Sequence, residues 1–186
     1  RGDAEDLIAL VRVQLGLNEK DKRFPRKGTI AEMFSKSENT LRPLDEIVVE
    51  EFNHFADHLE ALGQLQQGYQ ASKRQRQLVD YDDLLVLLRR LLMEDDAVRR
   101  TISSLYRYIL VDEYQDTNRL QADVIRYLAS THQNVMVVGD DSQSIYAFRG
   151  ATFKNIMEFP SLFPGTTIYK LEENYRSRPP VLHVAN

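Results

Sequence analysis

The stretch from Ile109 to Asn118, which reads ILVDEYQDTN, constrains the fold of this chain more than any other segment. Three aliphatic residues run directly into two adjacent carboxylates, Asp112 and Glu113. A continuous apolar run of this kind is typical of a strand buried on both faces of a parallel sheet. Acids directly after such a strand lie where ligands bind in open α/β sheets. The stretch therefore predicts an α/β fold with a ligand site at the carboxyl end of this strand.

A second apolar run, Val135 to Val138, predicts another buried strand, which Gly139-Asp140 break at the same edge of the sheet. In nucleoside triphosphatases, one carboxylate at such an edge holds Mg²⁺ and its neighbour orients or deprotonates the attacking water. Asp112 and Glu113 are candidates for these two tasks. A buried strand that ends in solvated acids is the alternative interpretation of the stretch when it is taken alone.

The composition is that of a globular protein. With 42% hydrophobic and 28% charged residues among 186, the chain suits one ordinary domain or two small ones. No apolar run approaches the ~20 residues that span a bilayer, and no signal peptide is seen, so a cytoplasmic protein is expected. The absence of cysteine excludes disulfides and cysteine-ligated metals. The net charge of −4 argues against a uniformly basic nucleic-acid surface but not against a local DNA groove.

The first 79 residues predict an all-helical unit. Asp3 is the expected N-cap of a first helix, which stops at Gly16, and a capping box at Thr29–Glu32 is expected to open a second helix. From Pro43 to Leu62, apolar residues recur at three- and four-residue spacing, which predicts one long amphipathic helix.

Gly63 and Gly68 are expected to break this long helix, and another helix follows through the basic tetrad 73–76. That tetrad and the basic segment 20–27 each have two interpretations. Each is either a solvated face or a contact to DNA phosphates.

Acidic residues then mark two further helix starts. Asp80–Asp83 opens a helix whose first turn complements the helix dipole, and Asp95-Asp96 starts a shorter one that leads to Ile109. The leucines between Leu84 and Leu92 are expected to pack the first of these two helices.

Three blocks, together with the DYDDLL element at 80–85, carry a family resemblance. They read DEYQDTN at 112–118, VMVVGDDSQSIYAFRGA at 135–151 and LEENYRS at 171–177. In this order and spacing the chain resembles superfamily 1 DNA helicases of the UvrD/Rep/PcrA type, most strongly from Tyr81 onward. The resemblance implies a partial P-loop NTPase (RecA-like) parallel sheet plus an all-α subdomain. Residues 1–79 would be the helical insertion, and residues 80–186 the C-terminal part of the first motor domain.

The resemblance assigns nucleotide chemistry to particular residues. Asp112 would coordinate the Mg²⁺ that accompanies ATP, Glu113 would act as catalytic base, and Gln143 would sense the γ-phosphate. Tyr175 would stack on the nucleotide base, and Arg176 would stabilise transition-state charge at the γ-phosphate. Gln115 and Asp116 belong to the same signature and are expected to give supporting hydrogen bonds.

The resemblance also implies contacts with single-stranded DNA. Tyr146 and Phe148 match the aromatic group that lies beside the strand, where bases stack at ~1–3 kcal/mol each. Core packing is an equally good interpretation of Phe148, whereas stacking is favoured for Tyr146. Arg149 is either a DNA contact or an internal ion-pair residue.

A phosphate-binding loop, GxxxxGK[ST], should precede these motifs, yet none of the eight glycines is followed by Lys-Ser or Lys-Thr. The expectation is therefore an internal fragment of a longer helicase. Alone, it should not hydrolyse ATP, because it lacks the loop that holds the phosphates. An incomplete sheet should also leave an uncovered edge through which the fragment self-associates.

The resemblance implies a parent enzyme that couples ATP hydrolysis to 3′-to-5′ translocation on single-stranded DNA and to duplex unwinding, in repair or replication restart. One alternative is an ATPase-less DNA- or protein-binding module. The intact set of Asp112, Glu113, Gln143 and Arg176 argues against it. The other alternative is a helicase-nuclease parent of the RecB or AddA type.

Overall fold

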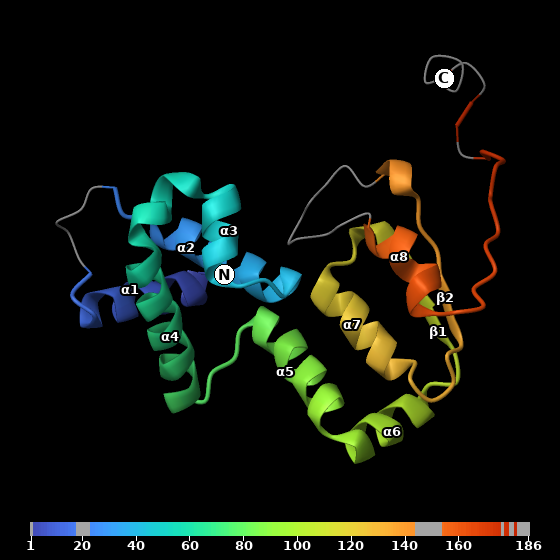
Figure 1. Cartoon of the computed structure of the whole chain (residues 1–186), viewed down its shortest axis with the longest axis horizontal. Coiled ribbons are helices and arrows are strands. Elements are labelled where there is room, and N and C mark those ends of the chain that lie inside the picture. Colours follow the sequence, from blue (N-terminus) through green and yellow to red (C-terminus); the bar gives the residue numbers. More distant parts are fainter. Residues whose placement is uncertain (1, 18–22, 144–153, 176, 179–180, 182–186) are drawn as a thin grey trace.

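The computed structural model describes residues 2–17, 23–143, 154–175, 177–178 and 181. Helices dominate this part of the chain, and a two-stranded parallel sheet accompanies them. Figure 1 shows α1 to α4 gathered on one side, the sheet with α7 and α8 on the other, and α5 between them. The expected combination of a helical unit with a parallel α/β part is therefore present in outline. No described helix is both long and apolar enough to cross a membrane.

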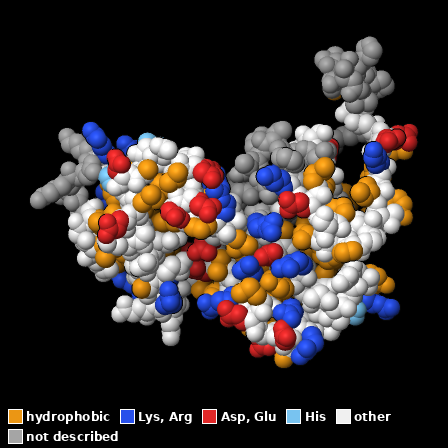
Figure 2. Space-filling view, viewed as in Figure 1, with side chains coloured by type: hydrophobic (Ala, Val, Ile, Leu, Met, Phe, Trp, Pro, Cys, Tyr) orange, Lys and Arg blue, Asp and Glu red, His pale blue; other side chains and the backbone are white. Residues whose placement is uncertain are grey.

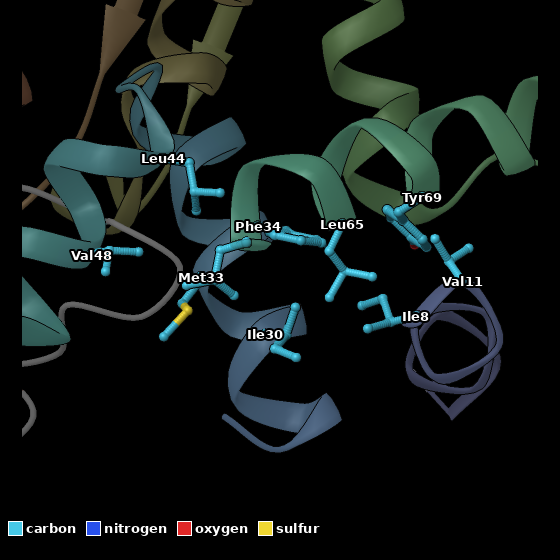
Figure 3. Packing of buried hydrophobic residues seen from close by; sticks show 10 residues of the cluster. Ile8, Val11, Ile30, Met33, Phe34, Leu44, Val48, Leu65 and Tyr69 are labelled. Carbon is cyan, nitrogen blue, oxygen red and sulfur yellow. The ribbon is translucent and has the colours of Figure 1, made fainter. Parts of the chain in front are cut away.

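The helical region consists of the four helices α1 to α4 and one 3₁₀ turn. Their bounds are α1 Gly2–Gln14, α2 Lys27–Thr40, α3 Leu44–Glu51, η1 Asn53–His58 and α4 Leu59–Gln75. Figure 3 shows how their apolar stripes meet in one cluster, with Ile8 and Val11 of α1 facing Leu65 and Tyr69 of α4. Each helix hides one stripe from water, and this burial is the main source of stability for such helices.

The predicted long helix from Pro43 is wrong, because α3 ends at Glu51 and a 3₁₀ turn follows. The side-chain amide of Asn53 donates to the Val49 carbonyl at 3.2 Å. This carbonyl is the one that the Asn53 backbone N–H would take in a continuing α-helix. The side chain therefore replaces the backbone bond at the point where the helix stops.

The predicted break at Gly63 and Gly68 is also wrong, because α4 runs through both residues. A Cβ atom at Gly68 would lie 2.7 Å from Val11 Cγ1, whereas nothing lies within 4 Å of one at Gly63. Gly68 therefore serves close packing of α4 on α1 and does not interrupt the helix.

Two predicted helix starts lie a residue or two away from their observed positions. Helix α1 already includes Gly2, so Asp3 lies in its first turn, and α2 begins at Lys27 without a side-chain cap instead of at the Thr29–Glu32 box. An extended Arg26 after Pro25 sets this earlier start, and Ile30 N–H makes the first helical bond to the Arg26 carbonyl. The stop at Gly16 is confirmed, with φ at +66°.

The second half of the chain begins with α5 Tyr81–Glu94 and α6 Asp96–Leu105, and both predicted helix starts are confirmed. Asp80 and Asp83 form a reciprocal capping box, and Asp95 accepts two backbone N–H bonds. The expected packing of α5 by its leucines is only partly observed. Leu92 is buried, but Leu84, Leu87 and Leu91 are exposed.

The sheet region consists of one crossover unit and a covering helix. Its elements are β1 Ile109–Val111, η2 Tyr114–Asp116, α7 Arg119–Leu128, β2 Val135–Val137, η3 Asp141–Gln143 and α8 Lys154–Leu162. The strands pair in parallel, and α7 connects them. Parallel strands need such a crossover, for which a helix is the usual choice.

Burial of the strands on both faces, which the apolar runs predicted, is wrong for this structure. Ile109, Val111, Val135 and Val137 face a cluster around Tyr114 and Phe159. Leu110 and Met136 point to the opposite face and are 75% and 58% exposed. Side chains alternate between the faces of a strand, and the described residues cover only one face of this sheet.

One ion pair joins α5 to α7, and a second pair within α7 shares its carboxylate. Arg89 Nε lies 2.8 Å from Asp123 Oδ2, and Arg126 approaches the other oxygen of the same carboxylate at 3.6 Å. Figure 2 shows basic side chains gathered with acidic ones on the face where α5 and α7 lie. The mixture of signs fits an interhelical contact better than a uniformly basic surface.

Lys73, part of the basic tetrad, is buried and belongs to neither a solvated face nor a DNA contact. Its ammonium lies 2.6 Å from Asp80 Oδ2 and 2.6 Å from Asp83 Oδ2, so it binds both members of the α5 capping box. The Tyr69 hydroxyl donates to the same Asp80 oxygen at 2.8 Å. Lys73 therefore fixes the end of α4 against the start of α5.

A buried pair of amides links the helical region to the sheet region. Asn118, directly after the acidic motif, donates from Nδ2 to Asn39 Oδ1 of α2 at 2.7 Å. Asn39 in turn donates to Asp82 Oδ1 of α5 at 2.9 Å. Three helices thus meet at one polar contact, in which each amide has a partner.

Candidate functional site

The parallel register brings the two predicted ligand-binding turns together. Ile109, Leu110 and Val111 pair with Val135, Met136 and Val137, so both strands end at the same edge. Beyond the strands, the backbone pairing continues from Val138 N–H to the Val111 carbonyl at 2.8 Å and from Tyr114 N–H to the Val138 carbonyl at 2.9 Å. The acidic turn after β1 is therefore fastened to the turn after β2.

Glu113 has a left-handed backbone conformation, with φ at 50° and ψ at 42°. Its N–H donates to Asp112 Oδ1 at 2.9 Å, and both carboxylates are exposed to solvent. A non-glycine residue in this region is disfavoured by about 1–2 kcal/mol. Such conformations persist where the surrounding structure holds them, and they concentrate at functional sites.

Gln115 is buried and uses both ends of its amide. Nε2 donates to Glu113 Oε2 at 2.6 Å, while Oε1 accepts the backbone N–H of Asp140 at 3.0 Å. The supporting hydrogen bonds expected of Gln115 are therefore present. Asp116, given the same expectation, is exposed, and its side chain makes no hydrogen bond with another residue of the described ranges.

Tyr114 anchors the motif in the core of the sheet region. Its ring is fully buried and meets Phe159 edge-on, with 5.5 Å between the ring centroids. Burial raises the pKa of the Tyr114 hydroxyl, an effect that Arg119 partly opposes. Within the described part of the chain, this hydroxyl has no hydrogen-bond partner.

The end of the motif starts the next helix. Asn118 Oδ1 accepts the Gln121 N–H at 2.9 Å, and Gln121 Oε1 accepts the Asn118 N–H at 3.0 Å, which forms a capping box for α7. Thr117 Oγ1 donates to the Tyr114 carbonyl at 2.6 Å. The chain from the carboxylates to the crossover helix is therefore fixed at successive residues.

Gln143 lies in the turn after β2, as predicted, and is exposed. Its Nε2 donates to Asp140 Oδ2 at 2.8 Å, while the other oxygen of Asp140 accepts the Ser142 N–H at 3.0 Å. The structure thus brings Asp112, Glu113 and Gln143 to one edge of the sheet.

Tyr175 is not brought to this edge. Its side chain is 84% exposed, and its hydroxyl donates to Glu173, a hydrogen bond that raises the pKa of Tyr175. The other four predicted site residues, Tyr146, Phe148, Arg149 and Arg176, lie outside the described residues.

No group of three or more acidic, histidine or cysteine side chains in the described ranges could hold a metal ion alone. Mg²⁺ in nucleotide sites is typically bound by one or two carboxylates, with phosphate oxygens and waters as its other ligands. One exposed carboxylate at a strand end, as in Asp112, fits that donor set, because phosphate oxygens and waters would supply the remaining ligands.

Sequence reasoning missed the connecting residues of the site. Gly139 was assigned only to a strand end, and Asp140 to no interaction, although the two lie against the Gln115 amide. Their position directly after a buried strand was the available signal. No sequence signal identified the Asn39–Asn118 contact.

Comparison with known proteins gives a consistent result. The family model described as "UvrD/REP helicase N-terminal domain" matches residues 2–164. DNA helicase II of Haemophilus influenzae is 38% identical over 99% of this chain, and that of Escherichia coli is 35% identical over 99%. The ATP-dependent DNA helicase Rep of Escherichia coli is 42% identical over 63% of the chain. The chain spans 25% of the length of the two DNA helicase II proteins and 18% of that of Rep.

Proposed function

The chain belongs to the UvrD/REP helicase family, and on this premise we propose that it forms part of the first motor domain of an ATP-dependent DNA helicase. The observation that carries the proposal is the meeting of Asp112, Glu113 and Gln143 at the carboxyl edge of one parallel strand pair. Ligands bind at this edge in open α/β sheets. The β1–α7–β2 unit would then be part of a RecA-like P-loop NTPase sheet, and residues 1–79 the helical insertion subdomain.

In this proposal the two adjacent carboxylates divide the work. Asp112 would hold Mg²⁺, which when bound neutralises charge on the β- and γ-phosphates of ATP. Glu113 would accept a proton from the attacking water, as a general base must lie within hydrogen-bond reach of its substrate. The exposure of Glu113 makes it accessible, and the Gln115 amide orients its carboxylate.

Gln143 would contact the γ-phosphate through an amide that can donate to phosphate and accept from water. Arg176 would stabilise transition-state charge, and Tyr175 would stack on the base, since its exposed ring is free of core packing. Tyr146, Phe148 and Arg149 would contact single-stranded DNA. The parent helicase would translocate 3′ to 5′ on single-stranded DNA and unwind partly duplex substrates.

The test is Mg²⁺-dependent ATP turnover by the full-length parent helicase, measured with and without single-stranded DNA. Glu113→Gln should lower kcat by ~10²–10⁴-fold, the usual contribution of a general base. Asp112→Asn should weaken the Mg²⁺ dependence. Glu60→Gln, an exposed carboxylate on α4, is the matched control and should leave turnover unchanged. Full turnover by Glu113→Gln would refute the proposed role of Glu113.

We further infer that the 186-residue chain on its own self-associates through its uncovered sheet. Leu110 and Met136 expose an apolar surface, and no further strand of the described residues pairs with the outer edges of β1 and β2, a combination that favours pairing with another chain. Light scattering should detect oligomers whose fraction rises with concentration, and Leu110→Lys should reduce it. A monomer at high protein concentration would contradict this inference.

A further inference from the structure

The Gln115 amide fits its surroundings in one orientation only. Its Nε2 faces the carboxylate oxygen Glu113 Oε2, which can only accept, and its Oε1 faces the N–H of Asp140, which can only donate. A flipped amide would place oxygen against carboxylate and NH₂ against N–H. A glutamate at this position would keep the bond to Asp140 but would place a second carboxylate beside Glu113. An apolar residue would lose both bonds.

Space for this amide depends on Gly139. A Cβ atom there would lie 2.6 Å from Gln115 Oε1 and 2.8 Å from Ile156 Cδ1. The first contact is with the polar group that holds Glu113, so it cannot be relieved without moving the amide. The absence of a side chain at Gly139 therefore permits the bond between Gln115 and Asp140.

The hydrogen bonds form a continuous path across the two strand ends. Gln143 Nε2 donates to the Asp140 carboxylate at 2.8 Å, and the Asp140 N–H donates to Gln115 at 3.0 Å. Gln115 then donates to Glu113 at 2.6 Å. Two exposed side chains on separate turns are thus connected through one buried amide.

We propose that Gln115 is a positioning residue that fixes the Glu113 carboxylate for catalysis and ties it, through Asp140, to Gln143. The inference rests on the proposed function, because it takes Glu113 as the base. The Glu113 side chain is exposed, so core packing does not fix its rotamer, and the Gln115 amide supplies a constraint through its hydrogen bond.

The first test needs no turnover. In NMR spectra of the 186-residue chain, the two Nε2 protons of Gln115 should resonate well apart and exchange slowly, because one is bonded to a carboxylate in a buried position. Glu113→Ala and Gly139→Ala should each move both signals toward the values of a solvated amide. Signals at those values in the wild-type chain would overturn the proposal.

The second test is kinetic and uses the intact protein. Gln115→Met keeps the volume but removes both bonds, and kcat should fall by ~10–100-fold, as for other residues that orient a reacting group. KM for ATP should stay unchanged, so that kcat and kcat/KM fall together. Gln115→Glu should lower kcat at least as far. Asn155→Leu is the control, since it removes another buried amide, bonded to the Thr117 carbonyl at 2.8 Å, and should leave kcat intact.

A double-mutant cycle tests whether Gly139 affects catalysis through the Gln115 amide. If Gly139 acts by making room for the amide, Gly139→Ala should lower kcat in the wild-type background and add little in Gln115→Met. Loss of turnover in Glu113→Gln together with normal kcat in Gln115→Met would overturn the positioning role alone. Normal turnover in Glu113→Gln would instead refute the proposed function on which it rests.

Discussion

The helical region and the sheet region of this chain bury their apolar side chains to different extents. In the helical region, apolar residues of all four helices form one cluster, which includes Ile30, Met33 and Leu65, each with no exposed surface. In the sheet region, the corresponding cluster covers one face of two short strands, and Leu110 and Met136 remain in solvent on the other.

The difference follows from the geometry of the two elements. A helix presents one apolar stripe, so four helices can bury their stripes against one another. A strand in a parallel sheet presents two faces, and both need a covering layer. The helical region therefore closes its core with its own residues, while the sheet region offers a surface to further structure.

The largest expected effect compares one leucine from each region. Leu65→Ala empties a fully buried position and should lower the free energy of unfolding by about 2–5 kcal/mol. Leu110→Ala removes the same atoms from a side chain that is 75% exposed. It should change the free energy of unfolding by less than about 0.5 kcal/mol. Urea denaturation of both variants measures the contrast, and equal losses would show that the exposed sheet face is covered in solution.

The next effect concerns the join between the regions. Lys73→Met should destabilise the chain by about 3 kcal/mol, because it leaves the Asp80 and Asp83 carboxylates without their counter-ion. The value is set at the low end of the range for buried pairs since the Asp80 side chain is still 26% exposed. Arg74→Met, on the solvated side of α4, is the control in the same denaturation experiment and should change stability little.

Two glycines in α4 should respond with opposite signs. Gly68→Ala forces a methyl group against Val11 and should cost about 1–3 kcal/mol. Gly63→Ala has open space and should stabilise the helix by about 0.5–1 kcal/mol. Thermal unfolding of the two variants tests whether α4 packs on α1 as described. Stabilisation by both substitutions would contradict the close contact at Gly68.

The pH dependence of stability should report on the same contact between Lys73, Asp80 and Asp83. Burial tends to raise the pKa of Asp80, but bonds from Lys73, the Asp83 backbone and Tyr69 outweigh it and lower the pKa. This contribution to stability is complete above the unfolded pKa of ~3.9 and is lost as pH falls through the lower folded pKa. Asp80→Asn should therefore flatten the acid limb of stability against pH below about 4.

Glu38 should act in a separate pH window with the opposite sign. Burial raises its pKa, with nearby Asp83, Asp80 and Asp82 adding to the effect and Lys73 opposing it. Stability from this residue rises as pH falls through the raised folded pKa and levels off near the unfolded value of ~4.3. Comparing Glu38→Gln with Asp80→Asn in the same titration separates the two contributions.

The smallest effect lies in the sheet region. Tyr114→Phe removes a buried hydroxyl that has no partner within the described ranges, so it should be neutral or stabilise by up to about 1 kcal/mol. Differential scanning calorimetry can detect the change. A loss above about 1 kcal/mol would show that the hydroxyl is bonded in solution.

Local signals allowed much of this structure to be predicted from sequence. The strand before Asp112, the helix starts at Asp80 and Asp95, and the stop at Gly16 each depend on a few neighbouring residues. The clustering of Asp112, Glu113 and Gln143 followed from a topological rule about parallel strands.

The features that were not predicted depend on contacts between distant segments. Gln115 meets Asp140 across 25 positions, and Asn39 meets Asn118 across 79. Gly68 looked like a helix break because its neighbour Val11 lies in another helix. An apolar run indicates that a strand can be buried on two faces, but it does not indicate which segment covers each face.

The hydrogen bonds made by residues along the segment 112–121 also fix how many residues this segment can contain. Glu113, Gln115, Thr117 and Asn118 each hold a partner at a set place in the chain. One inserted residue would rotate the cap by about 100° around the axis of α7 and would separate Asn118 from both Asn39 and Gln121. The segment should therefore accept several substitutions at its exposed positions but no change in length. A scan of single-residue insertions, scored for folded protein, should show a gap that begins at the carboxylates and ends inside the crossover helix.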